Sequence, residues 1–195
     1  MHGLINKALQ SFFIATYGDE RWMRVTETAG LGFSEFEAML IYDVDESLRV
    51  LDAMASELGR PLNEVLEDIG TFLVSDPQVE ALRRLLRFGG VTYVEFLHSL
   101  DDLPDRARLA VSDLVLPGLE LREHTAGQFS LTCEKGLPGF GSVMVGLLRA
   151  MADDYGALVM LDHVGEKDGR DVIGITLVET AFAEGRSFEL GARAG

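Results

Sequence analysis

The sequence predicts an α+β fold, with an N-terminal helical part followed by a four-stranded antiparallel sheet and one intervening helix. Apolar residues recur at helical spacing as far as residue 110, whereas the period changes to two beyond Pro117. The later segments follow the order strand, strand, helix, strand, strand, with no linker or internal repeat. We therefore expect a single domain over residues 1–195, mainly helical over 1–110, with sheet and helix over 111–180 and a tail over 181–195.

The first part of the chain has the pattern of five amphipathic helices. Ile5, Leu9 and Phe12 share one face of the first helix, and Asp19 can cap the second. Pro61 suits the first turn of the fourth helix. The five expected helices cover residues 2–16, 19–30, 45–58, 61–72 and 76–86.

A sixth, long helix is expected over 91–110, after the break at Gly89-Gly90. Its apolar side carries Tyr93, Phe96, Leu97, Leu100, Pro104 and Ala107. Its polar flank carries Glu95, His98, Ser99, Asp102 and Arg106.

Two hairpins are expected in the last third of the chain. The first alternates apolar and polar residues from Leu119 to Cys133 around a turn at Ala126-Gly127. A helix over 142–155 follows. The second hairpin pairs 157–164 with 171–179 around Asp168-Gly169, where a tight turn requires positive φ.

Composition restricts the partners and the compartment. The 32 acidic and 17 basic side chains give a formal charge of −15, which argues against binding to nucleic acid or to an anionic membrane. The N-terminus has no basic segment ahead of an apolar run, and no run is long enough to span a bilayer. The single cysteine, Cys133, rules out an internal disulfide and is expected to be an inert, inward-facing thiol. We expect a cytoplasmic protein.

The central segment carries a motif that resembles a known family. Glu95-Phe96-Leu97, Leu100-Asp101 and Leu103 are similar to the signalling helix of the haem-nitric oxide binding (H-NOX) family, which includes the sensor domain of the soluble guanylyl cyclase β subunit. In that family the next residue is the histidine that ligates the haem iron from the proximal side. In this chain the next residue is Pro104. Further matches are Ile5, Tyr17-Gly18, Ile41-Tyr42-Asp43 and the run from Leu103 to Pro117.

The resemblance implies haem b as the cofactor and nitric oxide or another diatomic gas as the ligand. By this resemblance Ile5, Pro117, Leu97, Leu100 and Pro104 are pocket positions, with Ile5 and Pro117 pressing against the haem.

The resemblance also implies a site for the haem propionates, which the family holds with a Tyr-x-Ser-x-Arg motif. The matching positions are Ser130, Thr132 and Glu134, and their alternation places them on one face of a strand. Glu134 would repel a propionate where the family has an arginine.

The four histidines are candidates to replace the missing iron ligand. His2 lies three residues before Ile5 and could approach a haem iron from the distal side. His98 lies on the polar flank between two carboxylates, while His124 and His163 are expected at the surface. The carboxylates at Asp101, Asp102 and Asp105 are expected to mark a solvated helix bend rather than a metal site.

Two functions remain open at this point. The first is a stand-alone sensor of bacterial type that holds haem and responds to a gas. The second is a haem-free regulatory module that binds another apolar ligand or a partner protein. We expect no enzyme, because the sequence shows no nucleophile with its base, no metal-binding spacing and no phosphate loop. Relatives imply a separate signalling partner, such as a histidine kinase or a cyclic-dinucleotide enzyme.

Overall fold

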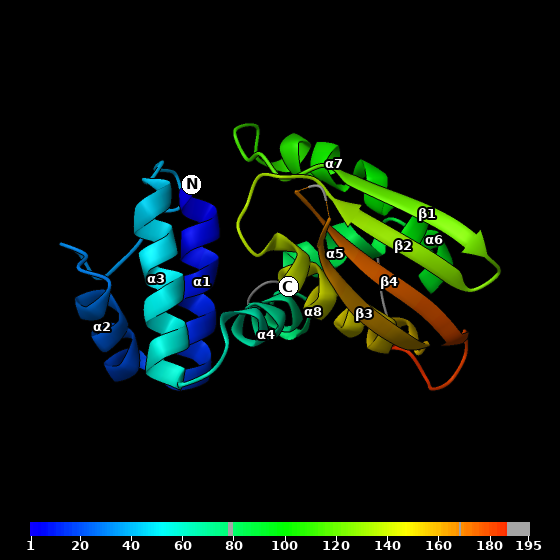
Figure 1. Ribbon diagram of the computed structural model, residues 1–195, viewed down its shortest axis with the longest axis horizontal. Coiled ribbons are helices and arrows are strands. Elements are labelled where there is room, and N and C mark those ends of the chain that lie inside the picture. Colours follow the sequence, from blue (N-terminus) through cyan, green and yellow to red (C-terminus); the bar gives the residue numbers. More distant parts are fainter. Residues whose placement is uncertain (78–79, 168, 187–195) are drawn as a thin grey trace, which may run out of the picture. The chain divides into compact units, whose positions relative to one another are not determined.

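The computed structural model describes residues 1–77, 80–167 and 169–186 of the chain (Figure 1). The chain divides into two compact units, Met1–Ile69 and Gly70–Gly195. The boundary between the units, at residues 69 and 70, lies before the end of the helical part expected at residue 110, because the helices after residue 70 pack with the sheet. The expectation that the chain forms a single domain stays a prediction.

The first unit contains three complete helices and the start of a fourth. They are α1 (Gly3–Tyr17), α2 (Asp19–Thr28), α3 (Val44–Leu58) and α4 (Leu62–Ser75). Helix α2 contacts both α1 and α3, and the rings of Phe13, Trp22 and Phe36 pack in the core. A Cβ at Gly3 would lie only 2.1 Å from the Glu37 carbonyl oxygen, so the start of α1 can approach this loop only as glycine.

The second unit is built on an antiparallel sheet whose strands follow the order β1-β2-β4-β3 (Figure 1). The strands are β1 (Leu119–Thr125), β2 (Gln128–Cys133), β3 (Leu158–Lys167) and β4 (Arg170–Glu179). Both expected hairpins are confirmed. Gly169 has the positive φ of 77° that the second turn requires, whereas Asp168 lies outside the described residues.

One face of this sheet is covered by helices. Helix α8 (Phe140–Tyr155) contacts β3 and β4, and α5 (Glu80–Arg87) belongs to the same unit. Phe129, Leu131 and Cys133 alternate along β2 toward this buried face. The predicted α+β class, with its strand, strand, helix, strand, strand order, is therefore confirmed.

The prediction of one continuous helix over 91–110 is wrong. The chain forms α6 (Tyr93–His98), a 3₁₀ turn η2 (Leu100–Asp102) and α7 (Leu103–Ala110). Pro104 stands in the first turn of α7, where a missing N–H leaves no helical carbonyl without its partner. The proline thus begins a new helix instead of bending an existing one.

Backbone hydrogen bonds explain the break. In a continuous helix residue 104 would donate to the Leu100 carbonyl, and proline has no N–H to do so. The Leu103 N–H donates to that carbonyl instead, which leaves the Ser99 carbonyl without its helical donor. The Arg106 guanidinium replaces it, since Nη2 donates to the Ser99 oxygen at 2.9 Å.

Candidate functional site

The pocket positions implied on the central segment lie in the packed core of the second unit. Leu97 and Leu100 are fully buried and join a cluster with Phe129, Leu131 and Met144. Pro104 is also buried. Its side chain is a hydrocarbon ring without a lone pair, so the position at which the resemblance implies the proximal ligand has no iron-binding group.

Pro117 and Glu134 are brought together at one end of the β1–β2 hairpin. The Glu134 N–H donates to the Gly118 carbonyl at 2.8 Å, and a Cβ at Gly136 would lie 3.1 Å from Pro117 Cγ. The Glu134 carboxylate accepts a hydrogen bond from Arg170 Nε at 3.1 Å. This end of the hairpin therefore presents an acid that already has a basic partner.

Ser130 and Thr132 lie on the face of β2 opposite the core, as the alternation predicts. The Ser130 hydroxyl is 2.8 Å from His124 Nε2. The cross-strand neighbour of Ser130 is Arg122, whose guanidinium is bound to Glu120 at 2.8 Å. Arg122 and Arg170, two cationic groups that could attract a propionate here, are thus each paired with a glutamate.

His2 has a structural task at the start of α1. Its ring is 7% exposed, and its Nδ1 accepts a hydrogen bond from the Leu4 N–H at 3.1 Å. Because Nδ1 is the acceptor, the neutral ring carries its proton on Nε2, whereas iron binding through Nε2 needs a lone pair there. Ile5 is half-buried beside it, and its own N–H donates to the His2 carbonyl.

The other histidines have polar neighbours, and none of them contacts another histidine. His98 Nε2 lies 3.6 Å from a carboxylate oxygen of Glu123 on β1, rather than beside the carboxylates of its own helix. His163 Nε2 lies 3.2 Å from Asp171 Oδ1. Among residues 1–77, 80–167 and 169–186, no group of three His, Cys, Asp or Glu side chains is arranged to hold a metal ion. Within the same ranges no helix is both long and apolar enough to cross a membrane.

The side chains at the implied positions do not fit a haem whose iron is bound by a protein ligand and whose propionates are bound by cationic groups. Pro104 offers no ligand, His2 has the unsuitable tautomer, and Glu134 repels a carboxylate. These side chains belong to two units, with His2 and Ile5 in the first and the remaining implied positions in the second.

Two residues of the central segment have roles that the sequence did not reveal. Asp101 Oδ1 accepts a hydrogen bond from the Leu121 N–H at 2.7 Å, so η2 is fastened to the outer edge of β1. Arg106 also donates to the Leu85 carbonyl at 3.1 Å, which joins α7 to α5. Burial lowers the pKa of this guanidinium. Both contacts depend on strand and helix positions far away in the sequence.

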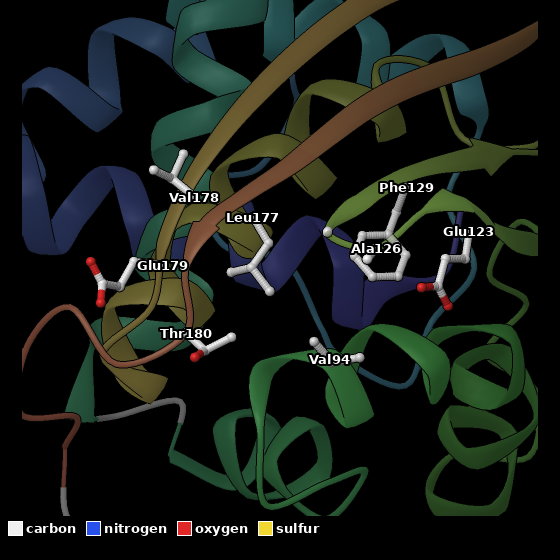
Figure 2. Close-up of a pocket in the computed structure, with 9 residues that line it drawn as sticks. Val94, Glu123, Ala126, Phe129, Leu177, Val178, Glu179 and Thr180 are labelled. Atoms are coloured by element: carbon white, nitrogen blue, oxygen red, sulfur yellow. The ribbon is translucent and has the colours of Figure 1, made fainter.

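A depression of about 550 Å³ lies at the opposite end of the β1–β2 hairpin from Pro117 (Figure 2). Strands of this length place it about 20 Å from that end. The lining residues are Val94, Glu123, Ala126, Gly127, Phe129, Leu177, Val178, Glu179 and Thr180. None of the positions implied for haem contributes to it.

Cys133 is buried, as the sequence indicated. Burial raises the pKa of its thiol to about 12, and the nearby Asp171 carboxylate acts in the same direction. The thiol is therefore protonated at neutral pH and unreactive.

The chain has a helical unit followed by a second unit, in which the broken helix α6–α7 precedes the four-stranded sheet. This arrangement is an H-NOX-like fold. The structure is similar to an H-NOX protein from S. oneidensis in the Fe(II)NO ligation state, with a TM-score of 0.73, 18% identity, and coverage of 91% of this chain and 99% of that one. It is also similar to an unliganded H-NOX mutant from K. algicida, with a TM-score of 0.76, 17% identity, and coverage of 92% and 97%.

Sequence comparison identifies the family. The haem-NO-binding family model matches residues 2–163, and the chain belongs to this family of sensor domains. It is 30% identical over 104 residues to soluble guanylate cyclase gcy-35 of Caenorhabditis elegans, which is 53% of this chain and 15% of that protein. It is 20% identical over 185 residues to soluble guanylate cyclase 89Db of Drosophila melanogaster, which is 95% of this chain and 28% of that protein. The chain thus spans less than a third of these relatives.

Proposed function

We propose that this chain is a regulatory domain of the haem-NO-binding family that signals without iron-bound haem. The observation that carries the proposal is the buried Pro104 at the start of α7, where the resemblance implies the proximal ligand. The pairing of Glu134 with Arg170 supports it, because the Arg170 guanidinium is already bound to a carboxylate. In place of haem the domain responds to another apolar ligand or to a partner protein.

The segment from α6 to α7 is the proposed transmitter. Its two helices meet at η2, where Arg106 donates to the Ser99 carbonyl in place of a backbone N–H and also to the Ser99 hydroxyl. Asp101 connects this joint to β1, and Arg106 connects it to α5. A change in the angle at the joint would therefore reach both the sheet and α5.

The receiver of this signal is proposed to be a separate signalling protein of the cytoplasm. The family resemblance favours a histidine kinase or a cyclic-dinucleotide enzyme. The curated relatives are named guanylate cyclases, and most of their length lies outside the part that this chain matches. The catalytic step is assigned to the partner, and this domain regulates it.

A second candidate is a haem-dependent gas sensor in which His2 binds the iron. The low exposure of its ring, 7%, favours this candidate, since an ordered buried imidazole is suited to ligation. It requires the hydrogen bond from the Leu4 N–H to break, so that the proton can move from Nε2 to Nδ1.

Absorption spectra after expression with added haem separate the two candidates. We expect the natural chain to lose haem on gel filtration and to show no Soret band. A retained band that disappears in His2→Ala, but persists in the surface control His124→Ala, would establish the second candidate and refute the first. Pro104→His tests the position itself, and a band gained only in this variant would show that the ligand alone was lost.

A further inference from the structure

We propose that the depression between α6 and the far end of the sheet is a docking site for a basic segment of a partner protein. The floor of the site is apolar and comes from Val94, Phe129 and Leu177. Glu123 and Glu179 stand on opposite sides of this floor (Figure 2). The proposal does not depend on whether the chain binds haem.

The charges around the floor define the chemistry of the occupant. Glu123 has only the half-exposed His98 beside it, at 3.6 Å, and Glu179 is exposed. The chain as a whole carries a formal charge of −15. A lysine or arginine side chain matches this arrangement, because its aliphatic stem can cover the half-buried Val94 and Leu177 while its charged end reaches a carboxylate.

The shape of the site favours a segment of a protein over a small molecule. Of the lining residues, Glu123, Ala126, Val178, Glu179 and Thr180 are exposed, so the depression is open to solvent. Small-molecule sites usually enclose most of their ligand. An open apolar floor with an acidic rim is instead suited to one or two side chains of a larger partner that makes further contacts elsewhere.

The site also touches the proposed transmitter. Val94 belongs to α6, and the next turn of this helix, at Phe96 and Leu97, is buried in the core. Glu123 belongs to β1, the strand whose edge Asp101 holds. An occupant therefore contacts α6 and β1, which both lie next to η2. Its binding can change the angle between α6 and α7.

The test uses a short fluorescein-labelled peptide that interleaves lysine and arginine with leucine, and a matched peptide with glutamate at the basic positions. Fluorescence anisotropy measures binding to the full chain. The test variant combines Glu123→Lys with Glu179→Lys. The control combines Glu27→Lys with Glu37→Lys, two exposed glutamates of the first unit, and changes the net charge by the same amount. Far-UV circular dichroism verifies that both variants are folded.

We expect the basic peptide to bind, the acidic peptide not to bind, and the test variant to lose about tenfold or more in affinity. The control variant should lose less than about threefold in affinity, because charges far from the peptide are screened by salt and act only through the net charge of the protein. Amide chemical shifts in NMR should change most at Ala126, Gly127 and Thr180. Equal losses in the two variants, shift changes confined to other surfaces, or no binding of the basic peptide would overturn the proposal.

Discussion

Replacing Arg106 with alanine tests the account of the helix break. The guanidinium donates to the Leu85 carbonyl, the Ser99 carbonyl and the Ser99 hydroxyl, at 3.1, 2.9 and 3.2 Å. Hydrogen bonds from a charged donor contribute about 1.5–3 kcal/mol each, and the cost of burying the guanidinium offsets part of their sum. We expect Arg106→Ala to lower the free energy of unfolding by about 2–4 kcal/mol.

Urea unfolding followed by far-UV circular dichroism measures this loss, and hydrogen exchange of the α6 and α7 amides locates it. Arg108→Ala is the matched control on the same helix. Arg108 is exposed and paired only with Asp105, so its loss should cost no more than about 0.5 kcal/mol. Arg106→Lys should be intermediate, since an ammonium group cannot span the separate acceptors. If Arg106→Ala and Arg108→Ala are equally stable, the Ser99 carbonyl does not need its side-chain donor and the explanation fails.

The remaining predictions concern three other buried or hydrogen-bonded groups, Cys133, Asp101 and Asp154. The Cys133 thiol should resist iodoacetamide at pH 8 in the folded protein and react in urea. Because its folded pKa of about 12 exceeds the ordinary 9.0, this group's contribution to stability is full below pH 9 and should fall as the pH rises toward 12; a flat profile of unfolding free energy in this range would contradict it. Asp101→Ala should cost about 1 kcal/mol in urea unfolding through loss of the hydrogen bond to Leu121, whereas Asp105→Ala, which loses an exposed pair with Arg108, should cost no more than about 0.5 kcal/mol. Asp154→Asn should cost about 3–5 kcal/mol, because the carboxylate is 1% exposed and lies 2.7 Å from Arg83 Nη2 and 3.6 Å from Arg87 Nε. Its exposed neighbour provides the comparison in the same assay, and a similar loss in Asp153→Asn would show that burial of the ion pairs is not the cause.

The order of the elements could be predicted because each depends on a local pattern. The alternation from Leu119 to Cys133 gave the first hairpin, and all six apolar positions of the central segment are buried. The break inside that segment was not predicted. The sequence showed Pro104 but not that Arg106 could reach the Ser99 carbonyl, and without that donor a bent helix was the simpler expectation.

For the candidate site, the sequence predicted which positions along the chain belong to it but not what their side chains contact. The residues that match the family motif follow from its spacing along the chain. The depression at Val94 and Glu179 was not predictable, because its lining comes from a helix, a hairpin turn and the end of β4, which no sequence motif connects. Similarly, the partner of His98 proved to be Glu123 across the fold instead of a carboxylate on its own helix.

The sequence by itself determined the α+β class and the resemblance to the family, because these depend on residue identity and on spacing along one element. Only the tertiary structure decided where the central helix breaks, which tautomer His2 carries, and which carboxylates already have partners. Those properties depend on which donor and acceptor atoms meet once the chain is folded. Some of these contacts are local, such as Leu4 to His2, and others join distant segments, such as Arg170 to Glu134.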